Sequence, residues 1–245
     1  MTQIAALPTR KDEDFRYADL DALAGIWPVK QVRHSVPSGE RLDLCIVLDG
    51  SEAISRDLEI DIEPGAQCRL HLLNAVDAYG RFQLRAILGE GAQFEFGAAQ
   101  LGADDHKLEI VTEVIHEEPN ATSSQIIRSV LAGSATGTYL GRVAVARGAN
   151  GTDSEQSVRA MLLSRTATAN ATPELEIFAD DVKCAHGCAV GELDAGALFY
   201  MASRGLPPAE AKKLMLQAFV AEAFVGAADE ERLLALALER LGELV

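Results

Sequence analysis

The sequence predicts a mainly β fold, arranged as a solenoid, with a small helical subdomain at its C-terminal end. Three observations favour this fold class: a long region of short alternating strands, a turn that recurs along it at a near-constant spacing, and a change to helical patterns after residue 190. Hydrophobic residues make up 48% of the 245 residues, which is enough to build a sizeable core.

Residues 1–38 are expected to form a short N-terminal segment with one helix. The pattern at about 14–24 is helical, with Leu20 and Leu23 as its apolar edge and Gly25 as a suitable stop. Pro28 then breaks the pattern, because a proline cannot donate the helical backbone hydrogen bond.

Residues 39–190 are expected to form the β core. The stretch DLEIDIE at 57–63 alternates strictly, with Leu58, Ile60 and Ile62 on one side and charged residues on the other. The stretches FQLRAIL, LEIVTEVI, SQIIRSVL and ELEIF repeat this period-2 pattern. No stretch at about 40–182 combines convincing helical periodicity with helix caps.

A weak repeat within the core indicates successive coils of a solenoid. Four triplets each open a strand after a turn, at offsets of 26, 29 and 28 residues: Gly65-Ala66-Gln67, Gly91-Ala92-Gln93, Asn120-Ala121-Thr122 and Gly148-Ala149-Asn150. Glycine and asparagine tolerate the left-handed backbone conformation that a sharp corner demands. The repeat is loose, so a β-sandwich or jelly roll remains the alternative arrangement.

Residues 191–245 are expected to form the helical subdomain. Asp194 is a suitable N-cap for a first helix, Gly205 a suitable end, and Pro207-Pro208 a suitable start for a second helix. The second helix is expected to bury most of its surface and to end at Gly226; its predicted stripe is Ala211, Leu214, Met215 and Ala218, widened by Leu216, Phe219, Val220 and Phe224. The predicted apolar face of the last helix is Leu234, Leu238, Leu241 and Val245.

Charge and cysteine content exclude several classes of protein. The net charge is −15 and no basic run exists, so neither nucleic acid nor an anionic membrane is an expected partner. No window approaches the ~20 apolar residues of a membrane helix, and the N-terminus lacks an apolar core of signal-peptide length. The cytoplasm is therefore the expected compartment, where the four cysteines would stay reduced.

The stretch KCAHGC at 183–188 carries the candidate site. Thiolate and imidazole bind zinc, iron and iron–sulfur clusters, and in an extended strand Cys184, His186 and Cys188 would point to one face. A complete structural zinc site needs four ligands, usually as two separated pairs, and no second pair is evident. The alternative is that the cysteines pack in a core and His186 joins a hydrogen-bond network.

Other chemistry finds little support in the sequence. A Cys–His nucleophile pair lacks suitable spacing, and neither the G-x-S-x-G nor the GxxxxGK[ST] motif is present. Carboxylates could face one another along a solenoid wall, as in polysaccharide lyases and glycosidases. Asp and Glu number 37, however, so a pair of them carries little information. The residues alone predict no reaction.

The stretch from 151 to about 224 resembles the C-terminal core of the SufB/SufD family of iron–sulfur cluster assembly scaffolds. The matching pieces keep their order: DSEQS, MLLS, PELEI, ADDVKCAHG, LFYMASRG and a helix ending in AF. Near the N-terminus, RKDEDFRYADL resembles the acidic–aromatic–Arg–Tyr opening of SufD-like members. The CAHG sequence favours the SufD-like branch, because SufB-like chains tend to carry a glutamate nearby and more cysteines.

The resemblance implies a right-handed parallel β-helix that serves as a non-catalytic scaffold subunit. It implies pairing with a SufB-like subunit and docking of a SufC-like ATPase on the C-terminal helices. A transient iron–sulfur cluster would assemble at the SufB–SufD interface, with His186 as a ligand and Cys184 as a supporting thiol, and no cofactor would be tightly bound. No role follows for Cys188.

Two features of the family bear on this chain. Members usually carry a longer, largely helical N-terminal region, whereas only about 40 residues precede the predicted β-helix here. The family also implies that isolated chains can form homodimers through the end of the β-helix.

Two alternatives remain open. One is a solenoid enzyme acting on polysaccharide, which the low aromatic content of 5% and the single Trp27 disfavour. The other is a protein that binds metal stably through its Cys/His cluster.

Overall fold

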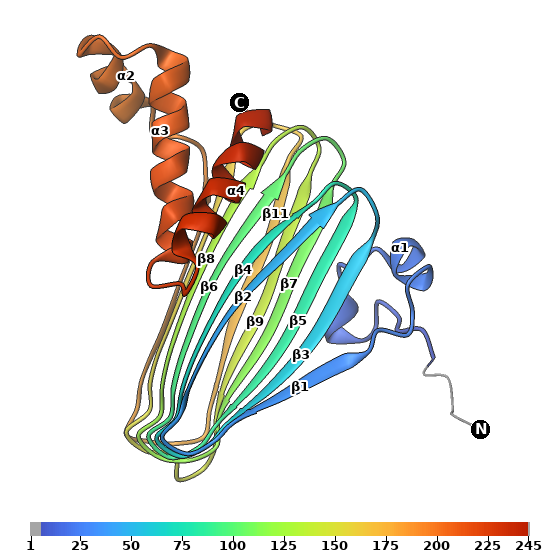
Figure 1. Ribbon diagram of the computed structural model, residues 1–245, viewed down its shortest axis with the longest axis vertical. Coiled ribbons are helices and arrows are strands. Elements are labelled where there is room, and N and C mark those ends of the chain that lie inside the picture. The colour runs from blue at the N-terminus through green and yellow to red at the C-terminus, as the bar shows by residue number, and fades with distance from the viewer. Residues whose placement is uncertain (1–5, 245) are drawn as a thin grey trace.

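The computed structural model describes residues 6–244, which form a flattened solenoid of parallel strands with helices packed on its outside (Figure 1). Odd-numbered strands form one six-stranded sheet and even-numbered strands form a second. Every coil adds one strand to each sheet, and each strand pairs in parallel with strands of the neighbouring coils. This arrangement confirms the mainly β solenoid and excludes the sandwich and the jelly roll.

The strands of the described residues divide between the two sheets as follows. The first sheet contains β1 (Gln31–Val36), β3 (Ile54–Ile62), β5 (Tyr79–Leu88), β7 (Lys107–His116), β9 (Thr136–Val145) and β11 (Thr168–Ile177). The second sheet contains β2 (Arg41–Gly50), β4 (Gln67–Val76), β6 (Gln93–Gly102), β8 (Thr122–Leu131), β10 (Asp153–Leu162) and β12 (Lys183–Gly191).

The recurring turn is present, with one correction. Gly65, Gly91 and Asn120 have φ angles of 70°, 63° and 61°, and the strands that follow them pair in register. The fourth corner in line with Asn120 is Gly151 and not Gly148, because Thr122 pairs with Asp153. Both glycines have positive φ, so an extra turn lengthens this coil while its strand keeps the register.

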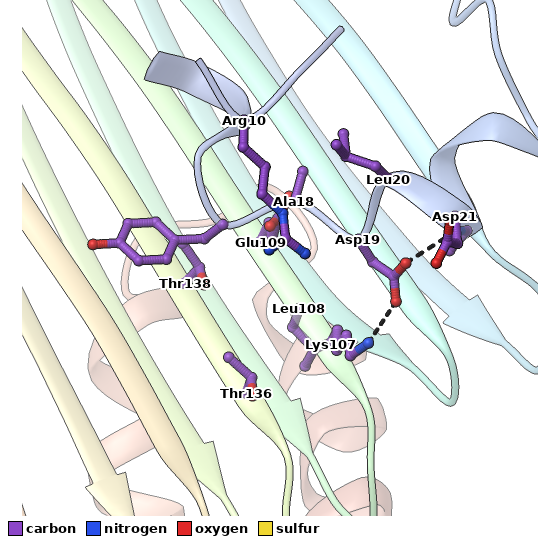
Figure 2. A pocket seen from close by; sticks show the side chains of 12 residues that line it. Arg10, Ala18, Asp19, Leu20, Asp21, Lys107, Leu108, Glu109, Thr136 and Thr138 are labelled. Carbon is purple, nitrogen blue, oxygen red and sulfur yellow. Dashed lines mark hydrogen bonds and ion pairs between the residues drawn. The ribbon is translucent and has the colours of Figure 1, made fainter. Parts of the chain in front are cut away.

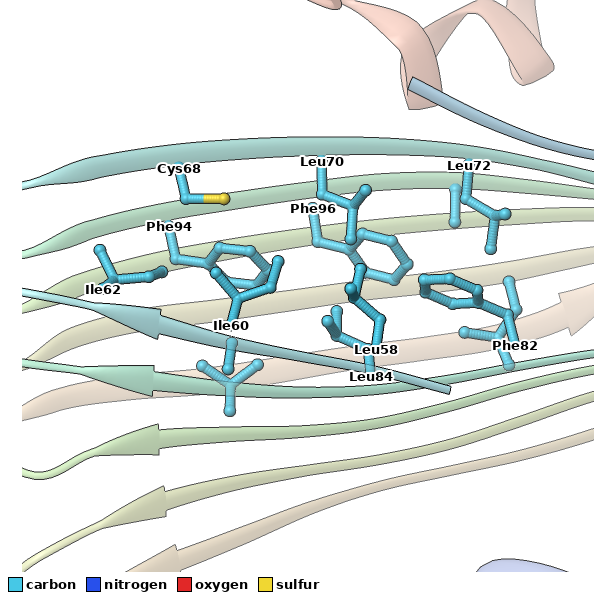
Figure 3. Close-up of a cluster of buried hydrophobic side chains, with 14 of the residues drawn as sticks. Leu58, Ile60, Ile62, Cys68, Leu70, Leu72, Phe82, Leu84, Phe94 and Phe96 are labelled. Carbon is cyan, nitrogen blue, oxygen red and sulfur yellow. The ribbon is translucent and has the colours of Figure 1, made fainter. Parts of the chain in front are cut away.

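The first coils enclose an apolar core between the two sheets. Leu58, Ile60 and Ile62 of β3 point inward, as their alternation predicted, and all three are buried. They meet inward side chains of β4 and β6, where the rings of Phe94 and Phe96 stack with centroids 6.5 Å apart (Figure 3). Burying a side chain of this size stabilises the fold by about 1.5–3 kcal/mol.

The N-terminal segment packs on the outer face of the first sheet. It contains η1 (Glu13–Phe15) and α1 (Leu20–Ala24), so the predicted helix is present but shorter than 14–24. The Arg81 guanidinium of β5 lies 4.2 Å from the centre of the Phe15 ring and donates a 2.8 Å hydrogen bond to the Asp14 carbonyl. Strand β1 pairs with β3, so the stack of strands begins at residue 31.

The C-terminal subdomain consists of α2 (Ala195–Ser203), α3 (Pro208–Ala221), η2 (Glu222–Phe224) and α4 (Glu230–Leu244). The Asp194 carboxylate caps α2 by accepting hydrogen bonds from the backbone N–H groups of Gly196 and Ala197, at 2.7 and 2.9 Å. Gly205 has a φ of 89° and Pro208 is the first residue of α3, as predicted.

The buried faces of the last two long helices differ from the prediction. Helix α3 buries Ala211, Leu216 and Val220, whereas Leu214 is 48% exposed and Ala218 is also exposed. Most of the helix is therefore not buried.

Helix α4 buries Leu233, Ala237 and Leu241, with Leu234 and Leu238 only half-buried, and Val245 lies outside the described residues. The buried face of α4 is therefore shifted from the predicted one and includes Ala237. No helix among residues 6–244 is long and apolar enough to cross a membrane.

Candidate functional site

Strand β12 carries the candidate ligands at the C-terminal edge of the second sheet. It pairs with β10 on one side, and no strand of residues 6–244 covers its other edge. In the register, Cys184 lies beside Ser154, His186 beside Gln156 and Cys188 beside Val158. These three β10 residues are buried and face the solenoid interior. The three candidate ligands therefore share the inner side of β12, as expected for an extended segment.

The inner side of the last coil is open at this end. Strand β11 is likewise the last strand of the first sheet. His186 and Cys188 are exposed and Cys184 is half-buried, although all three stand in line with buried residues of the preceding coil. Apolar side chains are exposed nearby, with Phe178 at 57% and Val190 at 47%. The site is thus part of an uncovered end face and is accessible to another chain.

The pKa values of both thiols of the site are raised. Burial, together with the nearby Asp153 carboxylate, raises the pKa of Cys184, and a backbone hydrogen bond with Ser154 opposes this only in part. Burial also raises the pKa of Cys188. A raised pKa makes a cysteine a poor nucleophile at neutral pH, which disfavours a Cys–His nucleophile. Metal binding would have to displace the thiol proton.

Cys184, His186 and Cys188 do not form a complete metal site by themselves. Within residues 6–244, no three His, Cys, Asp or Glu side chains are grouped so that they could hold a metal ion. Alternate residues of a strand are ~6.6 Å apart, whereas zinc lies ~2.0–2.3 Å from each nitrogen or sulfur ligand. The donor types suit iron, but their spacing does not bring the three side chains to one ion.

The remaining cysteines lie elsewhere. Cys68 is in the apolar core, where burial raises its pKa to about 12. It occupies the same inward position as Cys184 four strands away, a separation of ~19 Å at the usual strand spacing. Cys45 packs against the apolar cluster between the second sheet and the C-terminal helices. All four cysteines are free, and neither Cys45 nor Cys68 joins the candidate site.

Two further histidines are buried strand residues away from the candidate site. His71 is buried beneath η2, and His116 is buried in the core, where its Nε2 lies 2.9 Å from the Ser123 hydroxyl. Burial lowers the pKa of both, that of His116 to about 4.

Sequence reasoning missed the polar residues behind the site. Ser154 and Gln156 belong to the DSEQS stretch and are buried, at 2% and 0% exposure, directly beside Cys184 and His186. Tyr139 of β9 reaches Gln156 from the opposite sheet and accepts a 3.2 Å hydrogen bond from its Nε2. The offset of 30 residues between positions 156 and 186 is close to the coil period, so the repeat contained a signal for this pairing.

A separate pocket of about 640 Å³ lies between the N-terminal segment and the outer face of the first sheet (Figure 2). Two of its charged groups pair with each other: Lys107 Nζ lies 2.6 Å from the Asp19 carboxylate, and this hydrogen bond lowers the pKa of Asp19. Glu109 is held in the same way by Arg81, at 2.7 Å. The pocket faces away from the solenoid interior and has no connection to β12.

Comparison with known proteins gives a family match over most of the chain. Residues 49–219 match the family model described as SUF system FeS cluster assembly, SufBD core domain. An iron–sulfur cluster assembly SufBD family protein of Synechocystis sp. is 28% identical over 194 residues, which cover 79% of this chain and 41% of that protein.

Two further relatives are named SufD. The iron–sulfur cluster assembly protein SufD of Escherichia coli is 29% identical over 155 residues, covering 63% of this chain and 36% of that protein. SufD of Bacillus subtilis is 30% identical over 135 residues, covering 55% and 31%. The chain thus spans less than half the length of these relatives. The family model matches more than half of the chain, and the chain belongs to the SufB/SufD family of SUF-system iron–sulfur cluster assembly proteins.

Proposed function

We propose that this chain is a SufD-like, non-catalytic scaffold subunit whose β12 strand contributes ligands to a transient iron–sulfur cluster. The observation that carries the proposal is the location of His186 and Cys184 on the uncovered edge strand of the last coil. The imidazole nitrogen of His186 is the principal ligand, and Cys184 is a supporting thiol. The cluster is cargo that is built and released and not a resident cofactor.

The proposed partner at this end is a SufB-like subunit. Strands β11 and β12 each present an unpaired edge within the described chain, and a partner strand can extend such an edge by backbone hydrogen bonds. Ile177, Phe178 and Val190 add exposed apolar surface beside the ligands. The same surface would support a homodimer of the isolated chain.

An incomplete ligand set suits temporary assembly. One histidine and one thiol hold iron and sulfide only when the partner supplies further ligands, so separating the subunits weakens the site. The resulting assembly would need reduced thiols, which favours the cytoplasm.

A SufC-like ATPase is the proposed partner of the C-terminal helices. Helix α2 projects from the solenoid beside α3 (Figure 1) and buries none of its residues. Phe199 and Tyr200 of α2 are 76% and 59% exposed, and Leu214 of α3 is 48% exposed. Large exposed apolar side chains of this kind are typical of a protein interface. Nucleotide-driven movement of the ATPase would open and close the cluster site.

Co-expression with SufB and SufC homologues, followed by size-exclusion chromatography, tests the complex. We expect the three chains to elute together, and a chain that elutes apart from both partners would contradict the proposal. The His186→Ala variant should assemble normally and lose cluster formation. His34→Ala is the matched control, because His34 lies in β1 at the opposite end of the solenoid.

Metal analysis separates this proposal from the alternative of a stably bound metal. We expect the isolated chain to hold no stoichiometric iron or zinc after aerobic purification. A tightly held metal that His186→Ala removes would instead favour a stable Cys/His metal protein.

A further inference from the structure

The solenoid interior changes from apolar to polar as it approaches the two proposed ligands. Parallel register stacks inward residues into rows that cross the second sheet. The row ending at His186 is Leu70, Phe96, Gln125 and Gln156, and the row ending at Cys184 is Cys68, Phe94, Ser123 and Ser154. The row ending at Cys188 stays apolar, with Leu72, Ala98, Ile127 and Val158. The polar change therefore occurs behind Cys184 and His186 but not behind Cys188.

The row behind His186 belongs to a buried hydrogen-bond network that joins both sheets. Gln156 Nε2 donates to the Tyr139 hydroxyl at 3.2 Å. That hydroxyl lies 3.0 Å from Thr112 Oγ1 and donates to Gln125 Oε1 at 3.2 Å. All four residues are at most 2% exposed. In this arrangement Tyr139 engages the nitrogen of the Gln156 amide and not its oxygen.

The Gln156 oxygen is left without a donor. Its Oε1 atom is buried and has no hydrogen-bond partner among residues 6–244. Buried amide oxygens are rarely left unpaired, because losing water without gaining a donor is costly. Gln125 Nε2, one strand deeper, is also unpaired, so the two neighbouring amides do not bond to each other.

His186 is the remaining neighbour of Gln156 in this row. The Gln156 amide nitrogen is hydrogen-bonded to Tyr139, which is also hydrogen-bonded to Gln125 of β8. The Gln156 amide oxygen is therefore available to a side chain of β12. A neutral imidazole has one N–H donor and one nitrogen with a free lone pair. A hydrogen bond to Gln156 would use the N–H and leave the lone pair available.

We propose that Gln156 is a positioning residue for His186. When the exposed His186 side chain turns toward Gln156, the unpaired Oε1 would accept a hydrogen bond from one imidazole nitrogen, fix the tautomer and direct the other nitrogen toward the open end of the solenoid. The use of that second nitrogen as a cluster ligand rests on the proposed function, whereas the hydrogen bond does not. Partners of this kind typically change metal affinity or activity by about 10–100-fold.

Nitrogen NMR of the isolated chain, labelled with ¹⁵N-histidine, tests the hydrogen bond directly. At about pH 8.5, two units above the ordinary histidine pKa, we expect His186 of the wild type to show one dominant tautomer. In Gln156→Leu the ring nitrogens should move toward the averaged shifts of a histidine in an unstructured peptide. Unchanged His186 shifts in Gln156→Leu would overturn the proposal.

Gln100→Leu is the matched control for lost stability. Gln100 is also fully buried and hydrogen-bonded, accepting from the Ser129 hydroxyl at 2.9 Å, but it belongs to another row. The Gln100→Leu variant should destabilise the fold without changing the His186 shifts. An equal change of the His186 shifts in Gln100→Leu and Gln156→Leu would overturn the proposal. If Gln156→Leu does not fold, Tyr139→Phe decides, because it removes only the hydroxyl that holds the amide. A mixed tautomer in Tyr139→Phe supports the proposal and an unchanged one overturns it.

Cluster yield in the assembled complex separates this inference from the proposed function. Gln156→Leu should lower the yield at least about 10-fold. If Gln156→Leu changes the His186 tautomer while His186→Ala leaves the yield unchanged, the positioning role stands and the cluster function fails. If His186→Ala lowers the yield while Gln156→Leu leaves the tautomer unchanged, the cluster function stands and the positioning role fails.

Discussion

Gly97 of β6 lies directly beneath the Ala223 carbonyl of η2, so closely that a Cβ atom at position 97 would overlap that oxygen. The same Cβ would also lie 2.8 Å from Cδ2 of His71, the neighbour of Gly97 on β4. This close approach is where the C-terminal subdomain meets the second sheet. Arg128 reinforces it nearby by donating a 2.8 Å hydrogen bond to the Glu222 carboxylate.

Gly97→Ala should weaken the attachment of the C-terminal helices. Because backbone and not a flexible side chain blocks the added methyl, we expect a loss of about 1–3 kcal/mol in the free energy of unfolding, measured by urea denaturation. Gly242→Ala in α4 is the control, since a Cβ there meets nothing within 4 Å. That control should leave stability unchanged or raise it by up to ~1 kcal/mol, because alanine favours a helix. Equal stability of Gly97→Ala and wild type would contradict the close packing.

Arg81→Met should destabilise the chain strongly. Arg81 and Glu109 form an ion pair 2.7 Å long with side-chain exposures of 1% and 4%, and the Tyr79 hydroxyl donates to the same carboxylate at 2.8 Å. Removing the guanidinium leaves a buried carboxylate without its cation, which costs about 3–5 kcal/mol. Denaturant unfolding measures the loss. The Arg81→Met/Glu109→Gln double variant should recover part of it, and no recovery would argue against an uncompensated charge.

His116 should make the stability of the isolated chain depend on pH. Burial lowers the pKa of His116 from 6.5 to about 4, so between these values the unfolded chain binds more protons than the folded chain. The stabilising contribution is complete above pH 6.5 and is lost as the pH falls toward 4, with a total on the order of 3 kcal/mol. Urea denaturation at a series of pH values should show a shallower dependence for His116→Gln than for the wild type. Identical slopes would contradict this assignment.

Cys184→Ser and Cys188→Ser should differ in cluster formation, although both replace a thiol with a hydroxyl on the inner side of β12. Cys184 is half-buried beside the polar Ser154, whereas Cys188 is exposed beside the apolar Val158. We expect Cys184→Ser to lower the yield of reconstituted cluster in the complex and Cys188→Ser to leave it near the wild-type value. Iron and sulfide analysis measures both. A larger loss in Cys188→Ser would reverse the assignment of the supporting thiol.

Val190→Arg should prevent pairing at the open end without disturbing the fold. Val190 is 47% exposed on the inner side of β12, so an added charge would be buried only in the complex. Val32→Arg is the control, because Val32 of β1 is similarly exposed, at 46%, at the opposite end of the solenoid. Both variants should unfold within about 0.5 kcal/mol of the wild type. Light scattering of the mixed subunits should show pairing for Val32→Arg and none for Val190→Arg, and equal pairing would place the interface elsewhere.

The strands and most corners were predictable from sequence because their physical causes are local. Alternation identified Leu58, Ile60 and Ile62 as core residues, and glycine or asparagine marked the left-handed corners. The shift from Gly148 to Gly151 was not predictable from spacing, since a turn can lengthen without changing the register of the strands. Which face of α3 and of α4 is buried depends on how each helix packs against the sheet. The sequence of one helix alone does not contain that information.

The candidate site was only partly predictable for a similar reason. Cys184 and His186 stand out by residue type, because thiols and imidazoles are good ligands. Ser154 and Gln156 do not, since serine and glutamine are usual on solvated strands and DSEQS is polar on both faces. Their burial follows from the next coil lying over them, a relation between residues about 30 positions apart.

The uncovered last coil has a consequence for how the molecule behaves before assembly. Within residues 6–244, strands β11 and β12 lack the second neighbour that every inner strand has, so their backbone amides should exchange with solvent deuterium sooner than those of β5 or β6. A binding partner that continues both sheets would slow this exchange and stabilise β12, the strand that carries the proposed ligands. In that case strand β12 would become a well-ordered metal-binding edge only after the partner subunit has bound. The isolated chain would bind free iron weakly.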